Sequence, residues 1–177
     1  MSEFGVVTEP GTVRLERLLP GPIERVWAYL TESGKRGKWL ATGEMDLRLG
    51  GSTELRFRNS ELSPCREPTP ERFKQYQDVS FKGRITRFEP PRVLSYTWGE
   101  SWGEDSEVTF ELTPRGTDVV MVLTHRRLGD RSSMINVASG WHTHVDFLID
   151  ILNGREPPGF WSTHARLEAE YERRIAS

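Results

Sequence analysis

The strongest constraint on the fold is a change in hydrophobic period along the chain. From residue 44 to residue 125, apolar and polar side chains largely alternate, which is the two-residue period of strands with one buried face. After Asp130 the period becomes helical and continues to Leu152, where Asn153-Gly154 makes a typical helix end. Strands followed by one long helix predict an α+β fold in which the helix covers the apolar face of the sheet.

The alternation predicts six strands in this run. The first two form a hairpin around Gly50-Gly51, and a proline-rich loop from Ser60 to Gln75 separates them from the other four. Short turns join those four, including a turn at 99–105 that contains Trp102. Because tight turns join antiparallel strands, the sheet is expected to be antiparallel. The six predicted strands begin at Glu44, Thr53, Asp78, Arg92, Ser106 and Asp118.

A strand and a helix precede the run. Val13 and Leu15 alternate with charged residues and predict a strand, which the Pro-Gly-Pro sequence at 20–22 ends. The second proline suits the first turn of a helix, because the N–H that it lacks would have no partner there. Residues 23–30 then carry apolar side chains at helical spacing, and Trp39 anchors the short segment that follows.

The length of 177 residues fits one domain with a hydrophobic core. We expect residues 1–11 to be a flexible lead-in, residues 12–153 to form the domain, and residues 154–177 to be an extension that packs on it. The formal net charge of -2 provides no basic excess, so neither nucleic acid nor an anionic membrane surface is an expected partner.

The chain also lacks the patterns of a membrane or secreted protein. Its longest apolar run, Val119 to Leu123, is far too short to span a bilayer, and no signal-peptide pattern is visible at the N-terminus. Cys65 is the single cysteine, which excludes an internal disulfide and fits a reducing compartment. These features predict a cytoplasmic protein.

Two histidines, His142 and His144, stand two residues apart in the long helix. Side chains at this spacing point about 200° apart, so the two imidazoles cannot bind one metal ion from this helix. His142 precedes Asp146 by four residues, which predicts a surface pair. His144 shares the apolar stripe of Trp141 and Leu148, so we expect it to be buried with a hydrogen-bond partner, either in the core or in the wall of a pocket.

Candidates for chemistry are otherwise few. No Gly-rich phosphate loop, zinc-type Cys/His spacing, serine nucleophile elbow or paired-carboxylate motif is present, so no metal and no cofactor is expected. His125 is in register with Met121 and could face the same interior as His144, which leaves a proton-transfer pair as an alternative. Aromatic rings on the strands normally fill a core, but a helix lying in a curved sheet often leaves a void that such rings line.

Several stretches resemble the START-like (SRPBCC) superfamily, and within it the AHSA-type branch, named after activators of a heat-shock chaperone's ATPase. The resemblance covers residues 12–153 and implies the helix-grip (START/Bet v-like) fold, a curved antiparallel sheet wrapped around the C-terminal helix with a cavity between them. The loop from Ser60 to Gln75 and the extension depart from the family pattern, and could cover the cavity mouth or serve an oligomer interface. The similar stretches are "RLERLLPGPIERVWAYLTESGKRGKWL", "MDLRLGGSTELRF", "GRITRFEPPRVLSYTW", "VTFELTPRGTDVVMVLTH" and "GWHTHVDFLIDIL".

The resemblance implies three functions. The first is binding of an apolar or aromatic small molecule in the cavity. The second is a polyketide cyclase/aromatase-like activity, for which His144, His125 and Arg84 are the candidates. The third is a co-chaperone or stress-related role, which the family name implies, and a homodimer is a further expected partner. Binding is favoured because the sequence supplies many wall residues and few reactive groups. The expected ligand-binding residues are Tyr96, Trp98, Phe110, Met121, Trp141 and His144, with Trp39 and Phe57 as further candidates.

Overall fold

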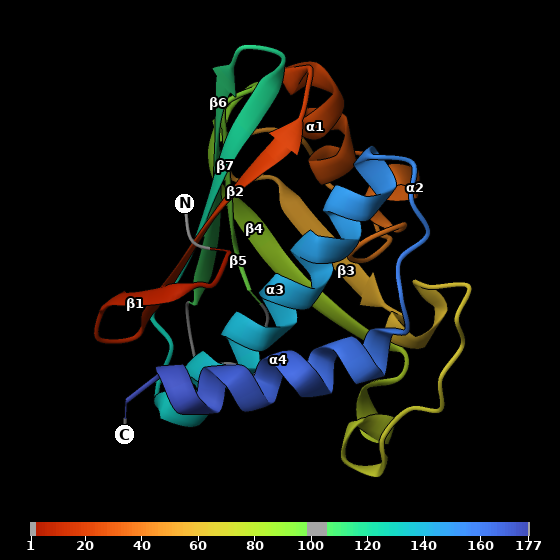
Figure 1. Ribbon diagram of the computed structural model, residues 1–177. Helices are drawn as coiled ribbons and strands as arrows, with labels where there is room; N and C mark the ends of the chain where they lie inside the picture. Colours follow the sequence, from red (N-terminus) through yellow and green to blue (C-terminus); the bar gives the residue numbers. More distant parts are fainter. Residues whose placement is uncertain (1–2, 99–105, 177) are drawn as a thin grey trace.

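One antiparallel sheet curves around a long helix in the computed structural model, which describes residues 3–98 and 106–176 (Figure 1). The expected turn at 99–105, with Trp102, lies outside the described residues. The described elements are β1 (Val6–Glu9), β2 (Thr12–Pro20), α1 (Ile23–Thr31), α2 (Ser33–Arg36), β3 (Ser52–Phe57), η1 (Asn59–Glu61), η2 (Glu71–Tyr76), β4 (Val79–Glu89), β5 (Val93–Thr97), β6 (Glu107–Arg115), β7 (Asp118–Arg126), α3 (Arg131–Leu152) and α4 (Phe160–Arg174).

The strand order is β1-β2-β7-β6-β5-β4-β3, with every neighbouring pair antiparallel. Consecutive strands lie side by side except for β2 and β3, because β2 pairs with β7 from Val13 to Pro20. The N-terminal strand therefore extends the sheet beyond the last hairpin. The predicted α+β class and antiparallel sheet are confirmed.

α3 begins and ends where the sequence predicts. Asp130 caps its N-terminus by accepting a hydrogen bond from the backbone N–H of Ser133 at 2.8 Å. Asn153 ends the helix, and Gly154 follows with φ +72°, a left-handed conformation that favours glycine.

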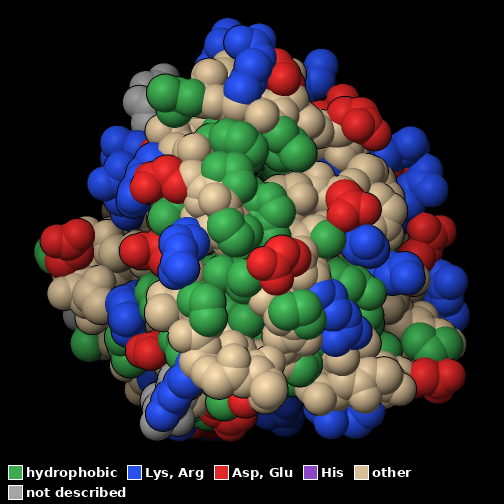
Figure 2. All heavy atoms as spheres, turned by 90° about the horizontal axis from the view of Figure 1, so that it is seen from above, with side chains coloured by type: hydrophobic (Ala, Val, Ile, Leu, Met, Phe, Trp, Pro, Cys, Tyr) green, Lys and Arg blue, Asp and Glu red, His purple; other side chains and the backbone are tan. Residues whose placement is uncertain are grey.

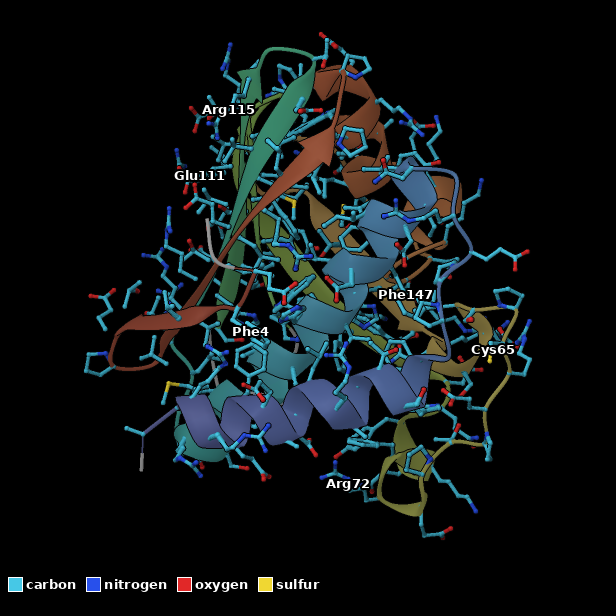
Figure 3. All side chains as sticks on the ribbon, viewed as in Figure 1. Phe4, Cys65, Arg72, Glu111, Arg115 and Phe147 are labelled. Atoms are coloured by element: carbon cyan, nitrogen blue, oxygen red, sulfur yellow. The ribbon has the colours of Figure 1, made fainter. Side chains whose placement is uncertain are left out.

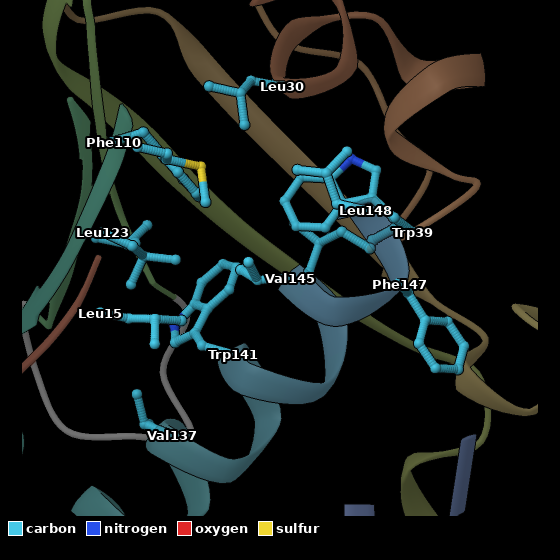
Figure 4. Packing of buried hydrophobic residues seen from close by; sticks show 14 of the residues in the cluster. Leu15, Leu30, Trp39, Phe110, Leu123, Val137, Trp141, Val145, Phe147 and Leu148 are labelled. Atoms are coloured by element: carbon cyan, nitrogen blue, oxygen red, sulfur yellow. The ribbon is translucent and has the colours of Figure 1, made fainter. Parts of the chain in front are cut away.

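Two layers bury α3 from opposite sides. Trp141 and Val145 point toward the sheet, whereas Phe147 points away from it (Figure 4). Phe147 meets Phe160 of α4 with ring centroids 5.6 Å apart. α4 lies across α3 on the side away from the sheet, as Figure 1 shows. Because of this second layer, α3 has no face that is wholly exposed to water.

Two predictions about local structure are wrong. Residues 44–49 do not form a strand, and only an isolated bridge joins Met45 to Thr53. Leu47 and Leu49 are 42% and 68% exposed, so their alternation does not mark a buried face. The segment expected to be a loose lead-in contains β1, which pairs with β2 at the edge of the sheet.

The 60–75 loop (residues 60–75) is held against the start of the C-terminal extension. The hydroxyl of Ser63 donates to the carbonyl of Pro157 at 2.8 Å, and the Glu67 carboxylate accepts from the N–H of Ser162 at 3.0 Å. Cys65 is exposed on the outer side of this loop (Figure 3). The two segments that depart from the family pattern therefore contact each other.

A chain of polar contacts joins the N-terminal segment to both C-terminal helices. The N–H of Gly5 donates to the Tyr171 hydroxyl at 2.7 Å, and that hydroxyl lies 2.8 Å from Nδ1 of His142. Nε2 of His142 lies 3.5 Å from Asp146, which also pairs with Arg17 of β2. His142 is 1% exposed, so its predicted surface role is wrong, although the expected pairing with Asp146 is present.

Aromatic contacts support this chain. Phe4 lies beside α3 and α4 in Figure 3, with its ring centroid 4.9 Å from that of His142 and 5.7 Å from that of Tyr171. The guanidinium of Arg174 covers the ring of Phe4 at 3.8 Å. Burial raises the pKa of Tyr171 to about 12, so its hydroxyl keeps its proton and donates to His142.

We predict that Tyr171→Phe lowers the free energy of unfolding by about 1–3 kcal/mol, because the Gly5 N–H and Nδ1 of His142 lose their partner in a buried site. Urea denaturation measures the change. The matched control is Tyr76→Phe, the same substitution at a residue that is 45% exposed. A loss in Tyr171→Phe no larger than in this control contradicts the prediction.

Candidate ligand-binding site

A cavity of about 270 Å³ lies between the sheet, α3, α4 and the 60–75 loop. Most of its wall is aromatic or aliphatic, and the polar side-chain groups are two asparagine amides, two imidazoles, three indole N–H groups and one phenol. Tyr76, at 45% exposed, marks where the cavity meets solvent. The lining residues are Leu40, Phe57, Asn59, Phe73, Tyr76, Val79, Phe81, Trp98, Asn136, Val137, Gly140, Trp141, His144, Phe160, Trp161 and His164.

His144 is the most constrained polar group of the wall. Its Nδ1 lies 2.8 Å from the carbonyl oxygen of Trp39, and because a carbonyl only accepts, Nδ1 carries the hydrogen. The ring lies beside Phe57 and Phe160, with centroids 6.1 and 5.2 Å away. Burial lowers the pKa of His144 to about 4, so the imidazole is neutral at pH 7 and Nε2 is an acceptor. The prediction of a buried, hydrogen-bonded His144 is confirmed.

A second polar cluster lies where α4 meets the 60–75 loop. The indole N–H of Trp161 donates to the hydroxyl of Ser60 at 2.8 Å, and the ring of Trp161 stacks on Phe73 at 5.1 Å. His164 meets Phe73 edge-on at 5.3 Å, and burial lowers the pKa of His164 to about 4. Beside this cluster, Oδ1 of Asn59 is buried without a hydrogen-bond partner among the described residues.

His125 belongs to the support of the cavity wall. Its Nδ1 accepts from the indole N–H of Trp141 at 3.0 Å, which leaves Nε2–H to donate to the hydroxyl of Ser106 at 3.2 Å. Ser106 in turn donates to the carbonyl of Trp98. Burial lowers the pKa of His125 to about 3, so the imidazole in this series of hydrogen bonds is neutral. Both nitrogens are occupied in fixing Trp141, whose ring packs 4.9 Å from Trp98.

The expected binding residues divide into two groups. Trp98, Trp141 and His144 line the cavity, as does the further candidate Phe57. The others are buried in the core and are not among the lining residues: Tyr96, Phe110, Met121 and Trp39.

Two of these core residues stand directly behind the wall. Phe110 meets Trp141 edge-on at 5.6 Å, and Tyr96 stacks on Trp98 at 6.3 Å. Trp39 reaches the site through its carbonyl, which binds His144. Contact of any of the predicted residues with a ligand stays a prediction.

The alternative catalytic candidates do not meet in the cavity. Arg84 is at an exposed position of β4 and does not line it. His125 is separated from the cavity by the aromatic rings that it supports, so the proposed proton-transfer pair with His144 is not formed.

Sequence reasoning missed the wall residues contributed by the loop and by the extension. Both segments were expected to lie near the cavity mouth, but no individual residue in them was identified. The sequence does contain a signal for these residues, because the loop and the extension each carry aromatic side chains among mostly polar ones. The missed residues of these two segments are Phe73, Phe160, Trp161 and His164. The other lining residues that were not predicted are Leu40, Asn59, Tyr76, Val79, Phe81, Asn136, Val137 and Gly140.

A curved antiparallel sheet that grips a C-terminal helix and encloses a cavity defines the helix-grip class of α+β proteins. The family model described as "Activator of Hsp90 ATPase homolog 1-like protein" matches residues 20–153. The chain belongs to this AHSA-type family of the START-like superfamily. Comparison with curated proteins finds no match.

Solved structures share the whole fold. A protein of Bordetella parapertussis, determined by solution NMR, is 46% identical and has a TM-score of 0.83, with 99% of this chain and 92% of that one covered. CalU16 from Micromonospora echinospora is 22% identical with a TM-score of 0.71, covering 94% and 89%. The Aha1 dimer from Colwellia psychrerythraea is 15% identical with a TM-score of 0.61, covering 80% and 95%.

No helix in residues 3–98 and 106–176 is both long and apolar enough to cross a membrane.

All four histidines are buried, with exposures of 0% to 7%, and none is visible on the face shown in Figure 2. On that face, hydrophobic side chains gather near the centre and charged ones surround them.

We predict that the protein loses stability as pH falls from 6.5 toward 4. The unfolded chain takes up a proton on each histidine near pH 6.5, whereas burial keeps the folded rings neutral until pH 4 or below. Each histidine then contributes a loss of about 2 kcal/mol by pH 5. Urea denaturation at pH 7.5, 6 and 5 measures the slope.

His125→Gln serves as the control for this assignment. It lowers stability at every pH because it breaks the contact with Trp141, but its stability falls less steeply between pH 7.5 and 5. A free energy of unfolding that is the same at pH 7.5 and pH 5 in the unmodified protein contradicts the prediction.

Proposed function

We propose that this protein binds an apolar or aromatic small molecule in the cavity between the sheet, α3 and α4. The observation that supports this most directly is the composition of the wall, which combines the aromatic side chains of eight Phe, Tyr and Trp residues with a few polar groups. Small-molecule sites are typically concave, mostly apolar, and equipped with a small number of oriented polar groups.

The volume limits the size of the ligand. An apolar cavity of about 150 Å³ is enough to hold benzene. A cavity of about 270 Å³ therefore suits a bicyclic aromatic molecule better than a lipid or a long polyketide chain. Rings of this size can stack or pack edge-on against Trp98, Trp141 and Phe160.

Binding remains favoured over a cyclase-like activity. Of the three catalytic candidates, only His144 lines the cavity, and its Nδ1 is committed to the Trp39 carbonyl. The co-chaperone role rests on the family name alone, and fold does not determine function. A homodimer, the assembly described for the Colwellia relative, stays a prediction for this chain, and native mass spectrometry of the purified protein tests it together with any retained ligand.

We predict that Gly140→Leu abolishes binding while the fold is retained. Gly140 lines the cavity on α3, and a Cβ added there meets no atom within 4 Å. The leucine side chain would project into the cavity, and leucine favours a helix interior by about 0.8 kcal/mol over glycine. Isothermal titration with 2-naphthol, a bicyclic probe, measures the loss of binding, and thermal denaturation checks the fold.

Gly34→Leu is the matched control, because an added Cβ is also unobstructed there and the position is exposed on α2. It should bind the probe as the unmodified protein does. Equal affinity of Gly140→Leu and the unmodified protein would place the probe outside the cavity and contradict the proposal.

A further inference from the structure

The polar groups of the cavity restrict which aromatic molecules fit it. Oδ1 of Asn59 is buried and has no hydrogen-bond partner among the described residues. A buried acceptor without a hydrogen-bond partner is unfavourable, so such a group in a native fold calls for an explanation. A hydrogen donated by a ligand would supply the missing partner.

A second acceptor lies in the same wall. Because Nδ1 of His144 donates to the Trp39 carbonyl, Nε2 carries a lone pair and no hydrogen. Nε2 has no hydrogen-bond partner among the described residues, and the ring lines the cavity. The two side chains reach the wall from segments far apart in the sequence, Asn59 from η1 and His144 from α3.

The part of the wall formed by residues 3–98 and 106–176 carries no formal charge. No Asp, Glu, Lys or Arg side chain of these ranges is among the lining residues, and burial keeps both imidazoles neutral at pH 7. A charged ligand would lose its hydration without gaining a counter-charge, which is unfavourable.

We propose that the ligand is an uncharged aromatic compound with a hydroxyl or N–H group that donates a hydrogen bond to Asn59 or His144. Phenols and aromatic heterocycles that carry an N–H group, such as indoles, are the chemical classes that meet this description. The inference rests on the proposed function, because it names the ligand class of the same cavity.

The test compares two probes of nearly equal shape, 2-naphthol and 2-fluoronaphthalene, which differ in the donor. Dissociation constants come from ligand-detected NMR at pH 7. We expect 2-naphthol to bind about 10-fold more tightly to the unmodified protein, since pairing one buried acceptor is worth about 1.4 kcal/mol. The negatively charged probe 2-naphthoate should bind more weakly than either.

The same ratio is then measured in Asn59→Leu and His144→Phe. Each removes one acceptor, and at least one of them should reduce the preference to within about 2-fold. Because general damage to the cavity weakens both probes alike, the ratio separates loss of the acceptor from loss of the fold.

The outcomes distinguish the two proposals. Equal binding of both probes to the unmodified protein overturns the donor inference and leaves the proposed function intact. A preference that survives in both variants overturns the assignment to Asn59 and His144. If neither probe binds, and neither shifts the thermal denaturation midpoint, the proposed function falls and the inference with it.

Discussion

The burial of α3 on two opposite sides is the constraint on which the rest of the structure depends. A helix in a curved sheet must be fixed both along its axis and around it. The hydrogen bond from Trp141 to His125 fixes the side that faces the sheet, and the contact of His142 with Tyr171 fixes the side that faces α4. Neutral imidazoles suit both positions, because each accepts a hydrogen bond through Nδ1 without the cost of burying a charge.

The cavity follows from the way these two layers meet. The large ring of Trp141 fills the space between α3 and the sheet at its own position, so no void remains there. One residue earlier, Gly140 has no side chain, and the neighbouring space is left open toward α4 and the 60–75 loop. Rings from the loop and from α4 close the far side, while their hydrogen bonds to each other keep that cover in place.

The sequence was sufficient for the architecture but only in part for the site. The limits of α3, the antiparallel order and the burial of His144 follow from period and capping residues, which are local signals. His142 was misplaced because a helical period identifies one buried face, and the second face is covered by α4, a long-range contact that no local pattern reports. The alternation of Leu47 and Leu49 predicted a strand that is absent. A two-residue period does not guarantee that a neighbouring strand is there to pair with, and both side chains are exposed.

The wall of the cavity also explains why family membership leaves the ligand open. The family model ends at residue 153, so it includes Trp98, Trp141 and His144 but none of the three lining residues of α4. Those residues, Phe160, Trp161 and His164, form the side of the cavity opposite the sheet. A relative can therefore share the sheet, α3 and the inner wall yet enclose a cavity of different shape and polarity. The shape and polarity of the cavity in this chain therefore depend on the contact between its extension and the 60–75 loop.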